Sequence, residues 1–326
     1  MNELTNKIKN NPLVSIICAT FNHENYIAQT IEGFLMQITN FSFEIIICED
    51  KSTDGTARIL KEYENKYPKL FVTFYHEENL YSKGVDFFQT EAFPIANGTY
   101  IAYCEGDDYW IDPLKLQKQV DFLEENSEYG MVYTRAKIFV QKQNKFKGVI
   151  GHNSINFEKL LVSNPIPTLT TCFRLSLLNK YLLDIKPSNM NWKMGDYPMW
   201  LYFAHESKIK FDNSISSIYR VIEKSASHFS SQQEKVGFVI SAYHIALFYA
   251  NKYRCNDKSL DDSIIAQYMW ILFMFWCSSA TIQLKNQIEQ ETKKLSKNNY
   301  LKIILIRITF NFPIFRYMFK YFHRIQ

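Results

Sequence analysis

Residues 104–110 read Cys-Glu-Gly-Asp-Asp-Tyr-Trp and follow directly on the apolar run Tyr-Ile-Ala-Tyr of residues 100–103. A short apolar run of this kind is typical of a buried strand. Three of the four residues 105–108 are carboxylates, which repel one another and raise one another's pKa unless a cation neutralises them. Mg²⁺ and Mn²⁺ prefer such hard oxygen ligands. The alternative is an acidic turn before a helix that begins at Asp112, so these residues alone leave both interpretations open.

The chain before this stretch alternates strands with helices. Apolar runs predict buried strands at 13–20, 43–48, 70–75 and 99–103, with helices between them. This order is typical of an α/β fold with a mainly parallel sheet sandwiched by helices, joined by right-handed crossovers. Ligands of such sheets bind at the carboxyl ends of the strands, where residues 104–110 lie.

The second half of the chain is expected to contain first a part with mixed strands and helices and then a part with helices alone. Up to residue 228 we expect a helix from residue 112, strands at 130–140, 144–150, 169–174, 208–211 and 215–222, and helices at 176–183 and from about 197 to 206. Long helices with few turn signals follow, at about 232–253, 259–282, 283–296 and 299–310. We therefore expect two domains, an α/β domain at 1–230 and a helical domain at 231–326.

Charge is unevenly distributed along the 326 residues. The net charge is only +4, yet residues 281–326 hold nine Lys and Arg against two Glu. A nearly neutral body with a basic aromatic tail does not favour sequence-specific nucleic-acid binding. The six cysteines have no CxxC spacing, which argues against a zinc site and agrees with a reducing cytoplasm.

The basic C-terminal region, residues 299–326, is rich in Ile, Phe and Tyr and contains no acid. Such a segment can lie in the headgroup plane of a membrane, and the alternative is that it packs on neighbouring helices or a second subunit. No apolar run reaches the roughly 20 residues that span a bilayer, and residues 1–11 lack a signal-peptide core. We expect a cytoplasmic protein, peripheral on the membrane or forming a homo-oligomer.

Five motifs in order resemble glycosyltransferase family 2, whose members have the GT-A fold. They are Val14–Asn22, Glu49–Thr56, Ala96–Ile101, Glu105–Trp110 and Gly195–Trp200, within about residues 12–228. Members of this family transfer a sugar from a nucleotide-sugar to an acceptor hydroxyl, usually with inversion at the anomeric carbon. The resemblance implies a UDP-sugar donor and a glycan or lipid-linked oligosaccharide acceptor, in the synthesis of a surface polysaccharide such as capsule.

The resemblance also assigns the donor side of the site. Residues 105–107 occupy the family's DXD position, so Mn²⁺ or Mg²⁺ is expected at Asp107, with Glu105 in place of the usual first Asp. The nucleotide-sugar is expected against Thr20, Asn22, Glu105, Gly106 and Asp108, with Asp50 accepting a hydrogen bond from the base. A uracil or thymine base suits Asp50, because its N3 carries a hydrogen.

Asp196 is expected to be the general base, since inversion requires a group that takes the proton of the attacking hydroxyl. The alternative is that Asp196 is only the N-cap of the helix beginning near residue 197. Arg220 and His228 are placed where family members carry basic residues that close over the diphosphate, with His228 a further candidate at the metal. His228 could equally be an ordinary surface histidine, and a buried core position is the default for Trp110.

Two other functions remain as alternatives. A sugar-phosphate nucleotidyltransferase has a similar nucleotide-binding half but prefers a Gly-rich phosphate loop, and residues 20–25 contain no Gly. A non-catalytic, membrane-associated scaffold would keep the fold and lose the carboxylates, which are present here.

Overall fold

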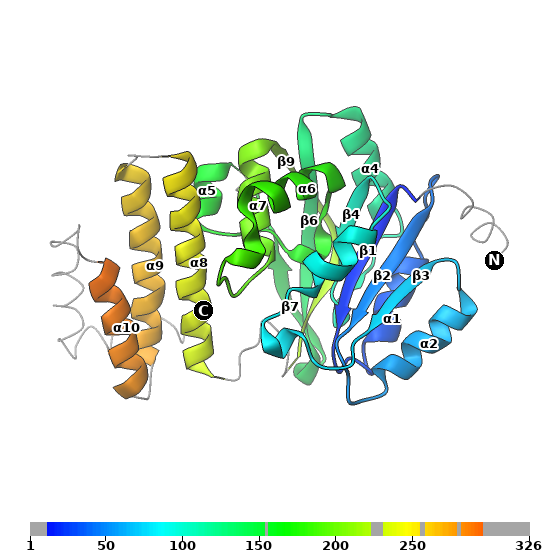
Figure 1. The fold of residues 1–326 in the computed structure, drawn as a ribbon, viewed down its shortest axis with the longest axis horizontal. Coiled ribbons are helices and arrows are strands. Elements are labelled where there is room, and N and C mark those ends of the chain that lie inside the picture. Colours follow the sequence, from blue (N-terminus) through cyan, green and yellow to red (C-terminus); the bar gives the residue numbers. More distant parts are fainter. Residues whose placement is uncertain (1–11, 154–155, 223–230, 255–257, 279–281, 296–326) are drawn as a thin grey trace. The chain divides into compact units, whose positions relative to one another are not determined.

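A computed structural model describes residues 12–153, 156–222, 231–254, 258–278 and 282–295 (Figure 1). The chain divides into two compact units, Met1–His228 and Phe229–Gln326. The first unit is built on a nine-stranded mixed sheet with the order β3-β2-β1-β4-β8-β6-β9-β5, and β7 pairs with β6 off this path.

The strands of the sheet are β1 (Val14–Thr20), β2 (Phe43–Glu49), β3 (Phe71–Tyr75), β4 (Tyr100–Tyr103), β5 (Tyr109–Trp110), β6 (Tyr129–Val140), β7 (Lys145–Ile150), β8 (Cys172–Arg174) and β9 (Lys208–Val221). The helices of the same unit are α1 (Ile27–Leu35), α2 (Thr56–Lys66), α3 (Phe93–Ile95), α4 (Lys115–Glu125), α5 (Phe157–Val162), α6 (Leu175–Ile185) and α7 (Asp196–Glu206).

The first four strands are parallel, as the alternation of strands and helices predicts. In β1, Val14 lies opposite Phe43 of β2 and opposite Tyr100 of β4. β1 is buried on both faces, which explains why its sequence is an uninterrupted apolar run. Because β1, β2 and β4 run the same way, their carboxyl ends meet at one edge of the sheet.

The other half of the sheet is mixed. β8 runs antiparallel to β4 and places Cys172 opposite Ala102, and β6 runs antiparallel to β8. β7 pairs with β6, which confirms the hairpin expected from residues 130–150. The two strands expected at 208–211 and 215–222 form one strand, β9, because irregular register against β6 absorbs the polar residues between them.

The helix expected between the strands at 70–75 and 99–103 also differs in the structure. A π-helical turn, Phe88–Ala92, leads into the short α3, and the preceding residues form loops and a 3₁₀ turn. Trp110 is 1% exposed, packs edge-on against Phe34 at 4.8 Å, and donates its indole N–H to the carbonyl of Leu169. Trp110 therefore belongs to the core.

The second unit consists, in its described part, of the helices α8 (Gln232–Tyr253), α9 (Lys258–Ser278) and α10 (Ile282–Leu295). Ser231 caps α8 by accepting the N–H of Glu234. Val236, Leu272, Leu284 and Ile288 form the buried centre. Within the described residues, no helix has both the length and the apolar character needed to cross a membrane. The basic segment 299–326 and His228 lie outside the described residues.

Candidate active site

The carboxylate loop, residues 104–108, extends from β4 along β1. The N–H of Cys104 donates to the carbonyl of Ile17, and the N–H of Gly106 donates to the carbonyl of Ala19 at 2.9 Å. A Cβ on Gly106 would lie 2.6 Å from Oγ1 of Thr20, so only glycine permits this close approach. The structure thus brings Thr20 against Gly106.

One hydroxyl supports this loop from α1. Oγ1 of Thr30 lies 3.0 Å from the carbonyl oxygen of Gly106 and 2.6 Å from that of Asp108. Thr30 is fully buried. The hydroxyl therefore fixes the backbone on both sides of Asp107 without touching its carboxylate.

Arg220 lies beneath the carboxylate loop. Its backbone N–H donates to Oδ1 of Asp108 at 2.7 Å, and its guanidinium donates to the carbonyl of Asp107 and to the side chain of Gln29. The guanidinium is sandwiched between the rings of Tyr26 and Tyr109, each 4.8 Å away, and the residue is 3% exposed. In this arrangement Arg220 positions the loop, and its contact with a diphosphate stays a prediction.

The carboxylates of the loop perturb one another. Burial and the charges of Asp107 and Asp196 raise the pKa of Glu105 to about 7. Burial and the charges of Asp107 and Glu105 raise the pKa of Asp108 against the opposing effect of Arg220. An excess of negative charge at this point favours a cation.

The imidazole of His23 also lies close to this cluster. Its Nε2 lies 4.0 Å from Oδ2 of Asp107, and its Nδ1 is 3.2 Å from Oγ1 of Thr20. Burial lowers the pKa of His23 more than the charge of Asp107 raises it. The sequence shows no partner for His23, because the contact depends on how the ends of β1 and β4 meet.

The loops after β1 and β2 are tied together by Asn22. Its side-chain oxygen accepts the N–H of Thr53 at 2.7 Å, and its own N–H donates to the hydroxyl of Ser52. Asn22 has a left-handed backbone with φ of 56°, a conformation that Asn tolerates better than most residues. Asn22 therefore shapes the edge where the nucleotide is expected.

Asp50 is 2% exposed and already has three partners. Its Oδ1 accepts the N–H of Leu80 and lies 2.9 Å from Nδ1 of His76, and its Oδ2 accepts the N–H of Tyr81. A carboxylate has about four lone-pair positions, so one further donor can be accommodated. The contact of Asp50 with a base stays a prediction, and the structure gives its carboxylate a structural role that the sequence did not indicate.

His76 is held between two carboxylates. Its Nε2 lies 2.6 Å from Oε2 of Glu91, opposite the contact of its Nδ1 with Asp50. Burial lowers the pKa of His76, but the hydrogen bonds and charges of Asp50 and Glu91 outweigh it, so the pKa is raised above its usual value. This connection joins β2, the end of β3 and the π-helical turn, and no spacing in the sequence indicates it.

Asp196 is the first residue of α7, and Gly195 is the N-cap. The capping alternative is therefore wrong in detail, because the carboxylate makes no cap hydrogen bond. Oδ2 of Asp196 accepts the hydroxyl of Thr168 at 2.7 Å, and Oδ1 accepts the N–H of Tyr197. Asp196 remains partly exposed, so its carboxylate is oriented and still reachable.

A further carboxylate, Asp86, lies near the start of α7. A Cβ on Gly195 would be 3.9 Å from Oδ2 of Asp86. Burial and the charges of Asp86, Glu105 and Asp196 raise the pKa of Tyr103. The buried hydroxyl of Tyr103 has no hydrogen-bond partner among the described residues. These groups come from three segments of the chain, and the sequence identified only Glu105 and Asp196.

A metal ion bound by protein ligands alone would require several of them to converge. Within the described residues, no three His, Cys, Asp or Glu side chains form a group that could hold a metal ion. His228 cannot be placed, since it lies outside those residues. A nucleotide-bound Mg²⁺ needs only one or two protein carboxylates, because phosphate oxygens and water complete its shell. Asp107 and Glu105 meet that smaller requirement.

These features define an α/β protein with a carboxylate loop at the carboxyl end of its fourth strand. The family model described as Glycosyl transferase family 2 matches residues 15–184, just over half of the chain. The chain therefore belongs to glycosyl transferase family 2, which makes it a member of an enzyme family and confirms the resemblance.

Curated relatives agree with this family. An uncharacterised protein of Mycobacterium tuberculosis is 36% identical over 164 residues, 49% of this chain and 46% of the relative. The putative glycosyltransferase EpsE of Bacillus subtilis is 31% identical over 66% of this chain and 74% of its own. UDP-Glc:alpha-D-GlcNAc-diphosphoundecaprenol beta-1,3-glucosyltransferase WfgD of Escherichia coli is 29% identical over 66% and 79%. The chain spans about half the length of the mycobacterial relative.

Solved structures give the fold. S. aureus TarS 1–349 in complex with UDP-GlcNAc has a TM-score of 0.63 at 18% identity, and the match covers 86% of this chain and 80% of the TarS 1–349 chain. The mannosyltransferase PcManGT from Pyrobaculum calidifontis, in complex with GDP-Man and Mn²⁺, has a TM-score of 0.56 at 12% identity, over 91% and 84%. The first unit has the GT-A fold, as expected.

Proposed function

We propose that the protein is a metal-dependent, inverting glycosyltransferase. It transfers a sugar from a UDP-sugar to a hydroxyl group of a glycan or lipid-linked acceptor. The observation that carries this proposal is the carboxylate loop at the end of β4, which lies against the end of β1 with Gly106 in close contact with Thr20. The charge of Asp196 raises the pKa of Glu105, although the two residues are far apart in sequence.

The donor side is supported by the loops that follow β1, β2 and β4. Asn22 and Asp50 border the place where the base and ribose would lie, and Gly106 lets the carboxylate loop approach Thr20 closely. A uracil N3–H could be the fourth donor to Asp50. The complex of TarS with UDP-GlcNAc and the UDP-Glc named for WfgD favour a uridine donor.

Asp107 and Glu105 are the residues that would hold Mn²⁺ or Mg²⁺. The bound ion would neutralise the charge that develops on the departing diphosphate. Asp108 is not proposed as a ligand, because its carboxylate accepts the backbone N–H of Arg220. Its role is to fix the loop so that Asp107 faces the donor.

Asp196 would act as the general base. As the acceptor oxygen forms its bond to the anomeric carbon, its proton moves to Asp196, and the diphosphate leaves with the electron pair of the broken C–O bond. The hydroxyl of Thr168 and the N–H of Tyr197 hold the two carboxylate oxygens in place. Because Asp196 is partly exposed, an acceptor can reach it.

A titration of UDP-sugars with and without Mn²⁺ tests the donor side. Wild-type protein should bind a UDP-sugar more tightly with Mn²⁺, and Asp107→Ala should lose that gain. The matched control is Asp121→Ala, which removes an exposed carboxylate on α4. Nucleotide affinity that depends on Mn²⁺ to the same extent in Asp107→Ala would remove Asp107 from the metal site.

The acceptor class is the finer part of the proposal. The name of WfgD describes transfer to a sugar on diphosphoundecaprenol, and the putative teichuronic acid glycosyltransferase TuaG of Bacillus subtilis is 28% identical over 66% of this chain. Both names favour a growing surface polysaccharide. A peripheral position on the cytoplasmic face of a membrane would bring the enzyme to such an acceptor.

A further inference from the structure

An open cavity of about 580 Å³ lies between β7 and the segment 164–167. Its polar walls are Arg135, His152 and Asn164, and its apolar walls include Val149, Ile150 and Ile166. No Asp or Glu lines it. The cavity therefore combines a cation with an apolar surface and has no carboxylate to neutralise that cation.

One wall of the cavity is connected to the proposed general base through the chain. Pro167 lines it, and the next residue, Thr168, donates its hydroxyl to Oδ2 of Asp196 at 2.7 Å. Pro167 is buried, and its carbonyl accepts the N–H and the hydroxyl of Thr170, so this short link has a fixed backbone. Residues 167 and 168 therefore link the wall of the cavity to the carboxylate of Asp196.

Arg135 has unused hydrogen-bonding capacity. Its Nε is buried and has no hydrogen-bond partner among the described residues. The guanidinium lies 5.8 Å from the ring of Phe211, which positions its plane without engaging its N–H groups. Buried donors in native structures are normally paired, and a guanidinium binds phosphate through two parallel hydrogen bonds. This donor set indicates an anionic ligand with several acceptor oxygens.

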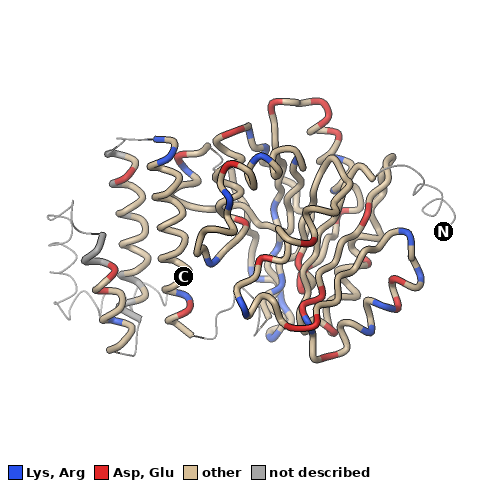
Figure 2. Tube along the Cα trace, in the orientation of Figure 1, with Lys and Arg blue, Asp and Glu red and all other residues tan. Residues whose placement is uncertain are grey.

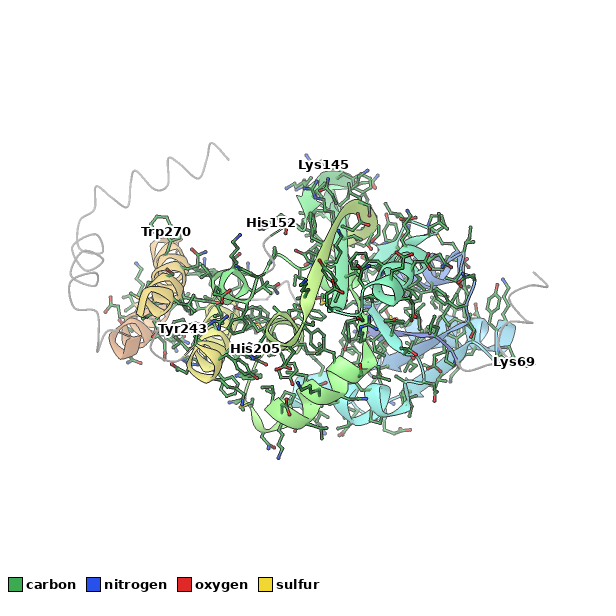
Figure 3. The ribbon with its side chains drawn as sticks, turned by 90° about the horizontal axis from the view of Figure 1, so that it is seen from above. Lys69, Lys145, His152, His205, Tyr243 and Trp270 are labelled. Atoms are coloured by element: carbon green, nitrogen blue, oxygen red, sulfur yellow. The ribbon has the colours of Figure 1, made fainter. Side chains whose placement is uncertain are left out.

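The surrounding hairpin adds positive charge. Residues 129–157, which include β6 and β7, contain one Arg and four Lys and no Asp or Glu. Figure 2 marks these basic residues in blue. Figure 3 shows His152 and Lys145 on the same side of the first unit, far from Lys69. A surface of one sign raises the local concentration of anions near the cavity.

We propose that this cavity binds the phosphate or diphosphate group of the acceptor, with Arg135 as its main anchor. The inference rests on the proposed glycosyl transfer and specifies its acceptor as a phosphorylated one. Two sources share this chemistry, a sugar diphosphate on a polyprenyl lipid and a phosphate within a soluble glycan polymer. The apolar walls Val149, Ile150 and Ile166 would contact the part of the lipid chain next to the diphosphate. They would add little to the affinity for a phosphate that carries no lipid.

Isothermal titration with two probes tests the cavity. Inorganic pyrophosphate and citronellyl diphosphate are titrated in EDTA, which suppresses any metal-bridged binding at the carboxylate loop. Arg135→Gln should weaken binding of citronellyl diphosphate by about tenfold or more, the usual range for a charge-assisted hydrogen bond. Lys69→Gln, which removes one exposed positive charge elsewhere, should bind like wild type.

The outcomes separate the sources. Tighter binding of citronellyl diphosphate than of pyrophosphate supports a lipid-linked acceptor, and equal binding supports a phosphate without a lipid. Equal affinities of wild type and Arg135→Gln for both probes would contradict the proposal that the cavity binds phosphate through Arg135. Arg135→Lys keeps the positive charge but cannot make two parallel hydrogen bonds, so we expect an intermediate loss of affinity for the probes. If Arg135→Gln does not fold, Arg135→Lys is used in its place.

The cavity and the donor site can fail independently. Binding of the diphosphate probes without any binding of nucleotide-sugars would overturn the proposed function and leave an anion site of another purpose. Mn²⁺-dependent binding of a nucleotide-sugar without probe binding would keep the proposed function and overturn the phosphorylated acceptor.

Discussion

The two sides of the candidate site are constructed differently. On the donor side, the ends of β1, β2 and β4 are joined by many hydrogen bonds, and Asp50 alone has three partners. On the acceptor side, Asp196 depends on one hydroxyl, that of Thr168, and on the next backbone N–H. The donor side is therefore part of the folded framework, whereas Asp196 is a partly exposed group added to that framework.

This difference predicts which properties a substitution on each side should change. A change on the donor side should lower both the stability of the fold and the affinity for nucleotide, because the same atoms serve both. A change at Asp196 should remove the reaction and leave the fold intact. Three substitutions test this division, ordered by the size of their effect.

Asp196→Asn should have the largest effect. Asn keeps the shape of the side chain and can still accept the Thr168 hydroxyl, but it cannot take a proton at the pH of the reaction. We expect the rate of sugar transfer to fall by about 10²–10⁴ while nucleotide affinity and thermal stability stay close to wild type. Transfer assays and a nucleotide titration measure this, and a fully active Asp196→Asn would exclude Asp196 as the base.

Gly106→Ala should act on stability and binding together. The new Cβ would lie 2.6 Å from Oγ1 and 2.8 Å from Cβ of Thr20, which is 2% exposed and cannot move freely. Such overpacking typically costs about 1–3 kcal/mol of unfolding free energy. Denaturant unfolding measures the loss, and nucleotide affinity should fall with it.

Gly195→Ala is the matched control for Gly106→Ala. Its nearest contact would be 3.9 Å, an ordinary van der Waals distance. We expect a loss of less than about 1 kcal/mol, the size of an N-cap effect. Equal losses for the two variants would contradict the difference between the two sides of the site.

His76→Gln should have the smallest effect, visible through its pH dependence. The folded pKa of His76 is raised, so its contribution is fully present below the unfolded pKa of about 6.5. It is lost as the pH rises through the folded pKa. Denaturant unfolding should therefore show a larger stability difference between wild type and His76→Gln at pH 6 than at pH 9.

The exposed His152 provides the control for this experiment. His152→Gln should change stability by the same small amount at both pH values. If His76→Gln behaved in the same way, the imidazole would not be held as a cation between Asp50 and Glu91, and the donor side would lack one of its connections.

The local pattern of apolar and polar residues was sufficient to predict many of the strands and helices of the first unit. Continuous apolar runs indicated β1, β2 and β4, and apolar residues at helical spacing indicated α1, with Ile27, Ile31 and Phe34 buried. Polar residues after each strand indicated the site edge, because parallel strands end together. The course of β9 was missed, since its pairing with β6 overrides the polar residues that interrupt its sequence.

Contacts between distant segments could not be predicted. His76 and Arg220 have ordinary neighbours in the sequence, yet one bridges two carboxylates and the other supports the carboxylate loop. The role of Arg135 could not be predicted either, because nothing in the sequence of a strand indicates which residues will surround its arginine. Each of these roles depends on which strands become neighbours.

The sequence by itself determined the strand and helix order, the family, and the carboxylates that mark the site, because these depend on spacing along the chain. The tertiary structure decided which of these groups meet. The charge of Asp196 raises the pKa of Glu105, and the carboxylate of Asp50 has three hydrogen-bond partners. Arg135 lines a cavity, and its Nε has no hydrogen-bond partner among the described residues. Burial and electrostatic coupling act through space, so residues far apart in sequence acquire their chemistry only when the sheet has formed.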